Sequence, residues 1–210
     1  TPGTACYKRH LTGDRKKILH KYPYGWITKA PHHNSNPCFA LSLEHPPMNS
    51  MMAAYDNLPG KRITMAEGEY VPTPVDWVRN QVELYESSGG KEGTTLMDTG
   101  LPCIIVTHKG NKTGAIRKTP LMQVKDDKSY VLIGSQGGAP KDPVWVHNLR
   151  ANSEVEIRDH ELVFNMRVRE VTDDAERARV WALGVACYPP YDDYKAKTSR
   201  KIPIFIADPV

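Results

Sequence analysis

The chain has 210 residues, of which 40% are hydrophobic and 25% charged, as is ordinary for a soluble globular protein. No run approaches the roughly 18 consecutive apolar residues that a membrane-spanning helix needs, and no basic segment followed by an apolar one stands at the start, so we expect no secretory signal. The net charge of +4 comes from residues 1–73, which hold nine Lys and Arg against five Asp and Glu; residues 74–210 hold nineteen of each. A neutral main body argues against nucleic-acid binding, which needs a basic face.

Residues 1–73 are predicted to form an irregular or disordered extension. They contain eight of the seventeen prolines and five of the eight histidines, without helical or strand periodicity, and such a segment rarely buries enough surface to offset its ordering entropy. His32 and His33, with His20 or His45, could be metal ligands, but no carboxylate or cysteine pattern supports them. The four cysteines form no CxxC pair, so we predict no metal site and reduced thiols, as in a cytosolic protein.

A helix is the first element predicted beyond this extension. Thr73 resembles its N-cap, Pro74 suits its first turn, and Gly89 and Gly90 would end it. The pattern then turns to short apolar runs separated by turn residues, which is typical of antiparallel strands. Strands are predicted over residues 103–107, 116–124, 130–134, 155–158, 162–171 and 202–206, the last with a proline near one end, as in an edge or entry strand.

Two further helices interrupt these strands. One is predicted over Pro143–Ala151, with Asp142 as its cap, and a longer one is predicted to start after a Thr172 cap and to end near Cys187. Few helices among many short strands indicate a small barrel flanked by helices. We therefore expect an α+β domain over residues 74–210.

The predicted hairpin turn Gly110–Gly114 is followed closely by Arg117 and Lys118. Free backbone N–H groups and cations within one hairpin suit a phosphate group. A plain exposed hairpin has the same composition, so the pattern leaves both interpretations open.

Ser135 and the glycines that follow it come directly after a predicted strand. Gly137 and Gly138 would let a flat ligand approach the backbone, and Ser135 could hydrogen-bond its reactive edge; a flexible strand exit is the alternative. Trp145 and Asn148 share one face of the next helix. Trp145 could be core or a cofactor wall, whereas a buried Asn148 needs polar partners.

Tyr188, Tyr191 and Tyr194 recur every third residue, so a helical turn would gather their rings on one side. Tyrosine clusters are often packing, yet phenols also bind quinones and aromatic rings, and an ordinary pKa of about 10 keeps them protonated at neutral pH. The sequence contains no GxGxxG, GxxxxGK[ST], HExxH or GxSxG motif. It therefore favours a redox cofactor held in a barrel over a hydrolase with a side-chain nucleophile.

Taken in chain order, the motifs of residues 74–210 resemble the deazaflavin (coenzyme F-420)-dependent nitroreductase and quinone reductase family of actinobacteria. The motifs that carry the resemblance are Thr99–Pro102, Gly110–Leu121, Gly137–Asn148, Tyr188–Tyr194 and Thr198–Pro203. The resemblance implies a split β-barrel of the flavin-binding type. It also implies reduced 8-hydroxy-5-deazaflavin as hydride donor, and a menaquinone-like quinone or, adventitiously, a nitroaromatic compound as acceptor.

The resemblance further implies roles for single residues. The 110–114 turn, with Lys112 and Arg117, would hold the phosphate and acidic tail of the cofactor, the loop after the third strand would approach its ring, and the tyrosines would line the acceptor side. The implied cofactor-binding residues are Lys112, Thr113, Gly114, Arg117, Lys118, Pro120, Met122, Ser135, Gln136, Gly137, Gly138, Ala139, Trp145 and Asn148, and the implied catalytic residues are Ser135, Tyr188, Tyr191 and Tyr194.

Two residues depart from the family pattern. Met122 and Gln136 stand where the nitroimidazole-reducing member has a tyrosine and a lysine, which puts nitroimidazole reduction in doubt but not quinone reduction. The alternatives are an FMN-binding split-barrel reductase and a non-catalytic carrier of deazaflavin or lipid. We expect a quinone or other small aromatic acceptor as partner, no nucleic acid, a monomer or homodimer, and a cytoplasmic location, with peripheral contact at the inner face of the plasma membrane as the alternative.

Overall fold

The computed structural model describes residues 68–210, so most of the predicted extension lies outside the described residues. Its last part pairs with the sheet. Tyr70 forms a parallel bridge with Ile116, and the N–H of Val71 donates to the carbonyl of Ile116 over 3.0 Å. The division of the chain at residue 73 stays a prediction.

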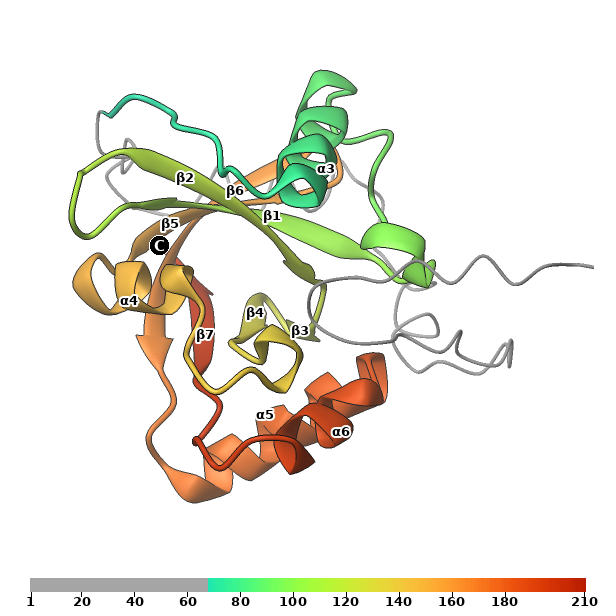
Figure 1. The fold of residues 1–210 in the computed structure, drawn as a ribbon, viewed down its shortest axis with the longest axis vertical. Helices are drawn as coiled ribbons and strands as arrows, with labels where there is room; N and C mark the ends of the chain where they lie inside the picture. Colours follow the sequence, from blue (N-terminus) through green and yellow to red (C-terminus); the bar gives the residue numbers. More distant parts are fainter. Residues whose placement is uncertain (1–67) are drawn as a thin grey trace, which may run out of the picture.

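A seven-stranded antiparallel sheet with helices at its margins forms the described part of the chain (Figure 1). Its helices are α3 (Asp76–Ser87), α4 (Val144–Ala151), α5 (Asp174–Cys187) and α6 (Pro190–Ala196), with 3-10 turns η2 (Met97–Thr99) and η3 (Gln136–Gly138). Its strands are β1 (Cys103–Lys109), β2 (Ile116–Met122), β3 (Lys125–Asp126), β4 (Ser129–Ile133), β5 (Glu154–Asp159), β6 (Leu162–Glu170) and β7 (Ile204–Pro209). The predicted α+β class is confirmed.

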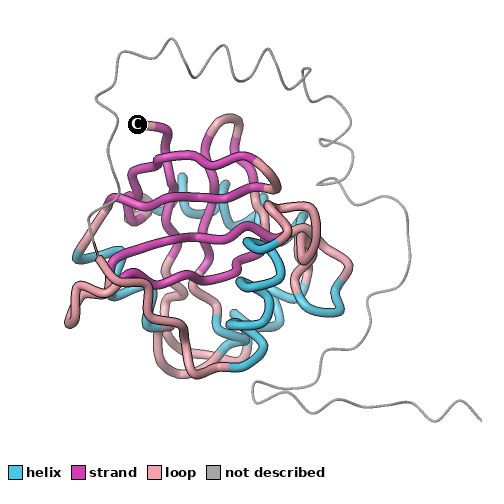
Figure 2. Tube along the Cα trace, turned by 90° about the horizontal axis from the view of Figure 1, so that it is seen from above, coloured by secondary structure: helices cyan, strands magenta, loops and turns pink. Residues whose placement is uncertain are grey.

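The sheet curls into a half-barrel, which Figure 2 shows from above. The strand order is β2-β1-β5-β6-β7-β4-β3, yet only Gln123 and Val124 separate β2 from β3 along the chain. The two ends of the sheet must therefore approach each other. Across the junction the N–H of Gln123 donates to the carbonyl of Pro102, and the N–H of Val131 to that of Val124, each over 2.9 Å. The predicted split β-barrel is confirmed.

Asp159, the last residue of β5, holds this junction together and is only 5% exposed. Its carboxylate accepts hydrogen bonds from Gln123 Nε2 (2.6 Å) and the Tyr130 hydroxyl (2.7 Å), and it pairs with Lys125 Nζ and His160 Nδ1 at 2.9 Å each. Burial alone would raise the pKa of Asp159, but hydrogen bonds from His160, Lys125 and Tyr130 together hold it well below its ordinary value. The junction therefore contains a buried, compensated negative charge.

Strand β1 is buried on both faces, which explains its continuous apolar run. One face contributes Ile104 to the barrel interior. The other contributes Ile105 to a smaller cluster in which α3 covers the sheet with Val82 and Tyr85. The Tyr85 hydroxyl donates to the carbonyl of Cys103 over 3.2 Å. Helix α3 is thus fixed on the outside of the strand, close to the cavity described below.

Two helices begin later than predicted. In α3, Thr73 Oγ1 accepts a hydrogen bond only from the N–H of Val75, before the helix begins. In α5 the cap is Asp173 rather than Thr172, and the Asp173 carboxylate accepts from the N–H of Glu176 over 2.8 Å. Neighbouring residues of similar capping ability compete, and sequence alone does not choose between them.

The prediction that Asp142 caps α4 is wrong. The N-cap is Pro143, which supplies no side-chain hydrogen bond. The Asp142 carboxylate instead binds Arg200 and Arg150, because two charge-assisted contacts are stronger than one cap.

The last strand lies inside the sheet, between β6 and β4, so its interpretation as an edge strand is wrong. Pro203 precedes the first strand residue, Ile204, and its missing N–H therefore removes no ladder bond. The carbonyl of Pro203 accepts from the N–H of Gly134 over 2.8 Å. The alternative interpretation, an entry proline, is correct.

Gly90, just beyond α3, predicts a specific loss of stability. Its φ is +87°, and a Cβ there would lie 1.9 Å from the carbonyl oxygen of His160. Gly90→Ala should therefore lower the free energy of unfolding by about 2–4 kcal/mol, through left-handed strain and forced backbone movement. Gly89→Ala is the control, because φ is +67° and nothing lies within 4 Å; it should cost about 1 kcal/mol. Urea denaturation measures both, and equal losses would contradict the close contact.

Candidate active site

A cavity of about 290 Å³ opens at the mouth of the barrel, near the lower limit of about 300 Å³ for small-molecule sites. It is bounded by α3, η2, β2, the loop after β4, the start of α4 and the tyrosines around α6. Most of its wall is apolar, with a few hydroxyl groups. The lining residues are Val75, Trp77, Val78, Leu96, Met97, Thr99, Thr119, Pro120, Leu121, Met122, Ile133, Ser135, Gln136, Gly137, Pro143, Val144, Trp145, Tyr188, Tyr191 and Tyr194.

The loop after β4 forms one wall through Ser135, Gln136 and Gly137. Its backbone is unusual, with φ of +46° at Gln136, +65° at Gly137 and +79° at Gly138; a positive φ is uncommon for a residue with a side chain. Gly138 itself faces α6, where a Cβ would lie 2.7 Å from the carbonyl oxygen of Tyr194. The glycine pair therefore does two things: one glycine lines the cavity and the other lets the loop pack on α6.

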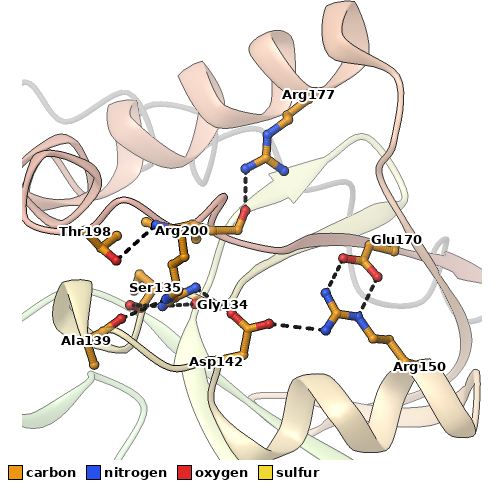
Figure 3. A network of polar contacts seen from close by, with 10 residues as sticks. Gly134, Ser135, Ala139, Asp142, Arg150, Glu170, Arg177, Thr198 and Arg200 are labelled. Atoms are coloured by element: carbon orange, nitrogen blue, oxygen red, sulfur yellow. Dashed lines mark hydrogen bonds and ion pairs between the residues drawn. The ribbon is translucent and has the colours of Figure 1, made fainter.

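Arg200 holds this loop from behind (Figure 3). Its Nε donates to the carbonyl of Ala139 (2.8 Å), and its Nη2 donates to those of Gly134 (2.9 Å) and Ser135 (2.7 Å). Its Nη1 pairs with Asp142 Oδ1 at 2.8 Å, and the side chain is 13% exposed. A guanidinium suits this task because its five N–H donors form a rigid planar fork.

Asp142 connects this clamp to a second ion pair (Figure 3). Its Oδ2 accepts from Arg150 Nη1 over 3.2 Å. Arg150 also donates to both carboxylate oxygens of Glu170, over 2.8 and 2.6 Å, and hydrogen bonding to Arg150 lowers the pKa of Glu170. Charged contacts therefore run from the cavity loop through α4 to the end of β6.

Three tyrosines form another wall, as predicted from their spacing. The ring centroids of Tyr188 and Tyr191 are 5.1 Å apart, and those of Tyr188 and Tyr194 are 6.0 Å apart. The hydroxyls of Tyr188 and Tyr194 lie 3.0 Å apart. Burial raises the pKa of both Tyr188 and Tyr191, so these phenols are protonated at neutral pH.

Cys103 is a free, buried thiol, as predicted, and burial raises its pKa to about 12. Within residues 68–210 there is no group of three His, Cys, Asp or Glu residues that could hold a metal ion.

The 110–114 turn lies outside the cavity wall. The N–H groups of Gly110, Asn111 and Gly114 donate to acceptors within the chain. Those of Lys112 and Thr113 have no recorded acceptor in the described part of the chain, and Lys112 is exposed. The turn therefore retains two adjacent donors and one cation for a ligand.

Arg117 and Lys118 are adjacent in β2, and each is engaged by the chain. Arg117 Nη1 donates to the carbonyls of Val71 (2.9 Å) and Pro72 (3.3 Å). Lys118 Nζ donates to Glu86 Oε1 over 2.6 Å, in a largely buried ion pair. A cofactor phosphate would have to replace these contacts, so their cofactor-binding role stays a prediction that the geometry favours less than that of Lys112.

The structure divides the predicted site residues into two groups. Those that line the cavity are Pro120, Met122, Ser135, Gln136, Gly137, Trp145, Tyr188, Tyr191 and Tyr194, and those that do not are Lys112, Thr113, Gly114, Arg117, Lys118, Gly138, Ala139 and Asn148. Sequence reasoning missed the wall formed by Val75, Trp77, Val78, Leu96 and Met97. No local sequence pattern predicts this wall, because its residues reach the cavity only when α3 packs on the sheet. It also missed Thr119, although its neighbour Pro120 was predicted.

These elements can be compared with known proteins. A family model described as F420H(2)-dependent quinone reductase matches residues 77–209. The chain belongs to this family. The resemblance drawn from the motifs is thereby confirmed, and the match includes every cavity-lining residue of this family member except Val75.

Individual relatives agree with this family assignment. An F420H(2)-dependent quinone reductase of Mycobacterium tuberculosis is 32% identical over 135 residues, which cover 63% of this family member and 89% of that protein. A second protein of that organism, named as a putative F420H(2)-dependent quinone reductase, is 28% identical over 109 residues, with coverages of 52% and 91%. A solved structure described as a domain-swapped dimer is 39% identical, with a TM-score of 0.51 and coverages of 65% and 100%.

The Arg200 clamp predicts a local effect on the cavity loop of this family member. Lysine keeps the charge but cannot serve three carbonyls and a carboxylate at once. Arg200→Lys should therefore speed amide hydrogen exchange at Gly138 and Ala139, whose N–H groups close the loop, by about tenfold or more relative to the strands. Arg179→Lys breaks a bidentate but exposed pair with Asp126 and should leave this loop unchanged. Equal exchange in both variants would show that the clamp does not hold the loop.

Proposed function

We propose that the cavity is the active site of an F420H2-dependent quinone reductase. Family membership makes the protein an oxidoreductase that uses F420H2 and a quinone. The observation that carries the assignment to this cavity is that the family match, over residues 77–209, includes all of the lining residues except Val75. The roles of single residues below are proposals argued from their geometry.

The residues of the cavity suit a flat aromatic group. Trp145 and Met122 give apolar surface, Gly137 exposes backbone, and Ser135 and Gln136 offer hydrogen bonds at the edge. Bound F420H2 would supply the hydride that a quinone accepts, so the chain has to grip, orient and exclude water rather than supply a reactive group. Met122 keeps this wall apolar but brings no hydroxyl, which argues against nitroimidazole reduction and not against quinone reduction.

The tyrosines supply hydrogen bonds on the acceptor side. A quinone that accepts a hydride also needs a proton at its oxygen, and a neutral phenol can donate or polarise there. Burial raises the pKa of Tyr188 and Tyr191, so these groups act as donors and not as phenolate bases at neutral pH. Tyr188 and Tyr194 share one hydrogen bond, which leaves one of their two protons for a ligand. Ser135 is the other candidate donor.

The tail of the cofactor carries negative charge, and the 110–114 turn suits it. The N–H groups of Lys112 and Thr113 are adjacent and have no recorded acceptor in residues 68–210. Lys112 is also exposed, so its side chain can reach a ligand bound at the turn. Backbone donors together with a cation form an anion site, so we assign the phosphate to this turn.

Two further predictions remain open. The oligomeric state is predicted to be a monomer or a homodimer; the relative described as a domain-swapped dimer supports the homodimer.

The location of the protein is predicted to be cytoplasmic, with peripheral membrane contact as the alternative. The helices of residues 68–210 include none with the length and apolar character needed to cross a bilayer.

Removing the phenol hydroxyls tests the acceptor wall. The triple variant Tyr188→Phe, Tyr191→Phe and Tyr194→Phe keeps the rings but removes the donors, and each lost hydrogen bond is worth about 0.5–1.5 kcal/mol. We expect kcat/KM for menadione to fall about tenfold or more, while the Kd of F420 changes less than about threefold. Tyr70→Phe, whose ring lies outside the cavity, is the control. Unchanged quinone turnover in the triple variant would refute the acceptor-wall role.

Cofactor choice is tested by titrating the apoprotein with F420 and with FMN and following the absorbance of each. We expect F420 to bind more tightly, and deazaflavin absorbance to recover when menadione is added to enzyme and F420H2. Preference for FMN would support the flavin-dependent alternative. Tight F420 binding without oxidation by any quinone would support a carrier.

A further inference from the structure

A line of buried polar side chains joins the 110–114 turn to the cavity wall. The N–H of Asn111 donates to Asn148 Oδ1 over 2.9 Å. Asn148 Nδ2 lies 3.3 Å from His108 Nδ1, and His108 Nε2 lies 3.1 Å from Thr119 Oγ1. Asn148 and His108 are buried and lie outside the cavity wall, whereas Thr119 lines it. The three side chains thus form a continuous path from the proposed phosphate turn to the cavity.

One backbone group fixes the direction of every bond along this path. A peptide N–H can only donate, so the Asn148 atom that faces Asn111 is the carbonyl oxygen, and the amide nitrogen faces His108. An amide nitrogen also only donates, so His108 Nδ1 has to be the unprotonated ring nitrogen. The proton of the neutral imidazole is then on Nε2, which donates to Thr119 Oγ1.

The imidazole stays in this single state at neutral pH. His108 is 2% exposed. Burial, with a smaller contribution from the charge of Arg117, lowers its pKa to about 4. A neutral ring with one nitrogen held as acceptor has one tautomer, so the orientation of the Thr119 hydroxyl does not vary across the neutral range.

This arrangement has a consequence at the cavity. The Thr119 oxygen already accepts the proton of His108, so its own hydroxyl proton must point elsewhere. No acceptor for that proton is recorded among residues 68–210, and Thr119 lines the cavity. We propose that His108 is a positioning residue that holds the Thr119 hydroxyl as a hydrogen-bond donor to a carbonyl oxygen of the planar ligand. Asn148 acts indirectly: it selects the tautomer of His108 and does not touch the ligand. The proposal rests on the proposed function for the identity of that ligand.

Binding of F420 to five variants tests the role of the hydroxyl. Thr119→Val removes it and should raise the Kd of F420, or the KM of menadione, about three- to tenfold with kcat changed less, because one neutral hydrogen bond is lost. Thr119→Ser keeps the hydroxyl and should restore binding to within about twofold. Thr107→Val replaces a buried threonine of β1 that lies outside the cavity and should leave both constants unchanged.

A double variant tests the role of His108. In a His108→Phe background the effect of Thr119→Val on binding should shrink, since the imidazole no longer orients the Thr119 hydroxyl. Equal binding by Thr119→Val and Thr119→Ser would overturn the proposal. So would a double variant whose loss of binding free energy equals the sum of the losses in His108→Phe and Thr119→Val.

The tautomer provides a readout that needs no ligand. Nitrogen-15 NMR of the His108 ring, assigned with His108→Phe or, if that variant does not fold, with His108→Gln, should show a proton on Nε2 and none on Nδ1 at pH 7. A proton on Nδ1 would overturn the proposal whatever the enzyme binds. If the tautomer is as stated but wild-type protein binds neither F420 nor quinone, the proposed function fails while the orientation of Thr119 stands, so the two failures are distinguishable.

Discussion

Two residues, Gln123 and Val124, set the shape of the molecule, because they alone join the strands at opposite ends of a seven-stranded sheet. Laid flat, strands about 4.8 Å apart would place β2 and β3 about 29 Å from each other. The three links from Met122 to Lys125 reach at most about 11 Å. The sheet can satisfy both conditions only by curling, and Asp159 fixes the result by binding Gln123 and Lys125 at the junction.

Curling also creates the site. The end of β2, the loop after β4 and the tyrosines around α6 all line the cavity, so its walls come from segments that are distant in the chain. Arg200 binds carbonyls 61 to 66 positions earlier, and thereby joins the segment after α6 to the loop that bears Ser135. Hydride transfer between two bound rings depends on their distance and orientation. Arg200 fixes the position of a loop that lines the cavity, and it does not line the cavity itself.

Much of this arrangement follows from local sequence. Alternating or continuous apolar runs located most strands, and the three-residue spacing of the tyrosines located their cluster. What local sequence could not supply depends on partners far along the chain. Asp142 has the chemistry of a helix cap, but local sequence does not show that Arg150 and Arg200 become its neighbours in the fold. For the same reason β7 became an interior strand, and Trp77 became a wall residue only through the packing of α3.

The buried carboxylate at the junction has a consequence for the behaviour of the molecule in acid. Because the pKa of Asp159 is depressed in the folded state, its stabilising effect is complete above the ordinary range of a carboxyl group, near 4, and is lost as the medium becomes more acidic. Protonation would remove the charge that draws together Lys125, His160 and the β2–β3 link. Because the pKa of Asp159 lies below that of an ordinary carboxyl group, the seam keeps its charge until the medium is strongly acidic, after the carboxylates of ordinary pKa have taken up protons.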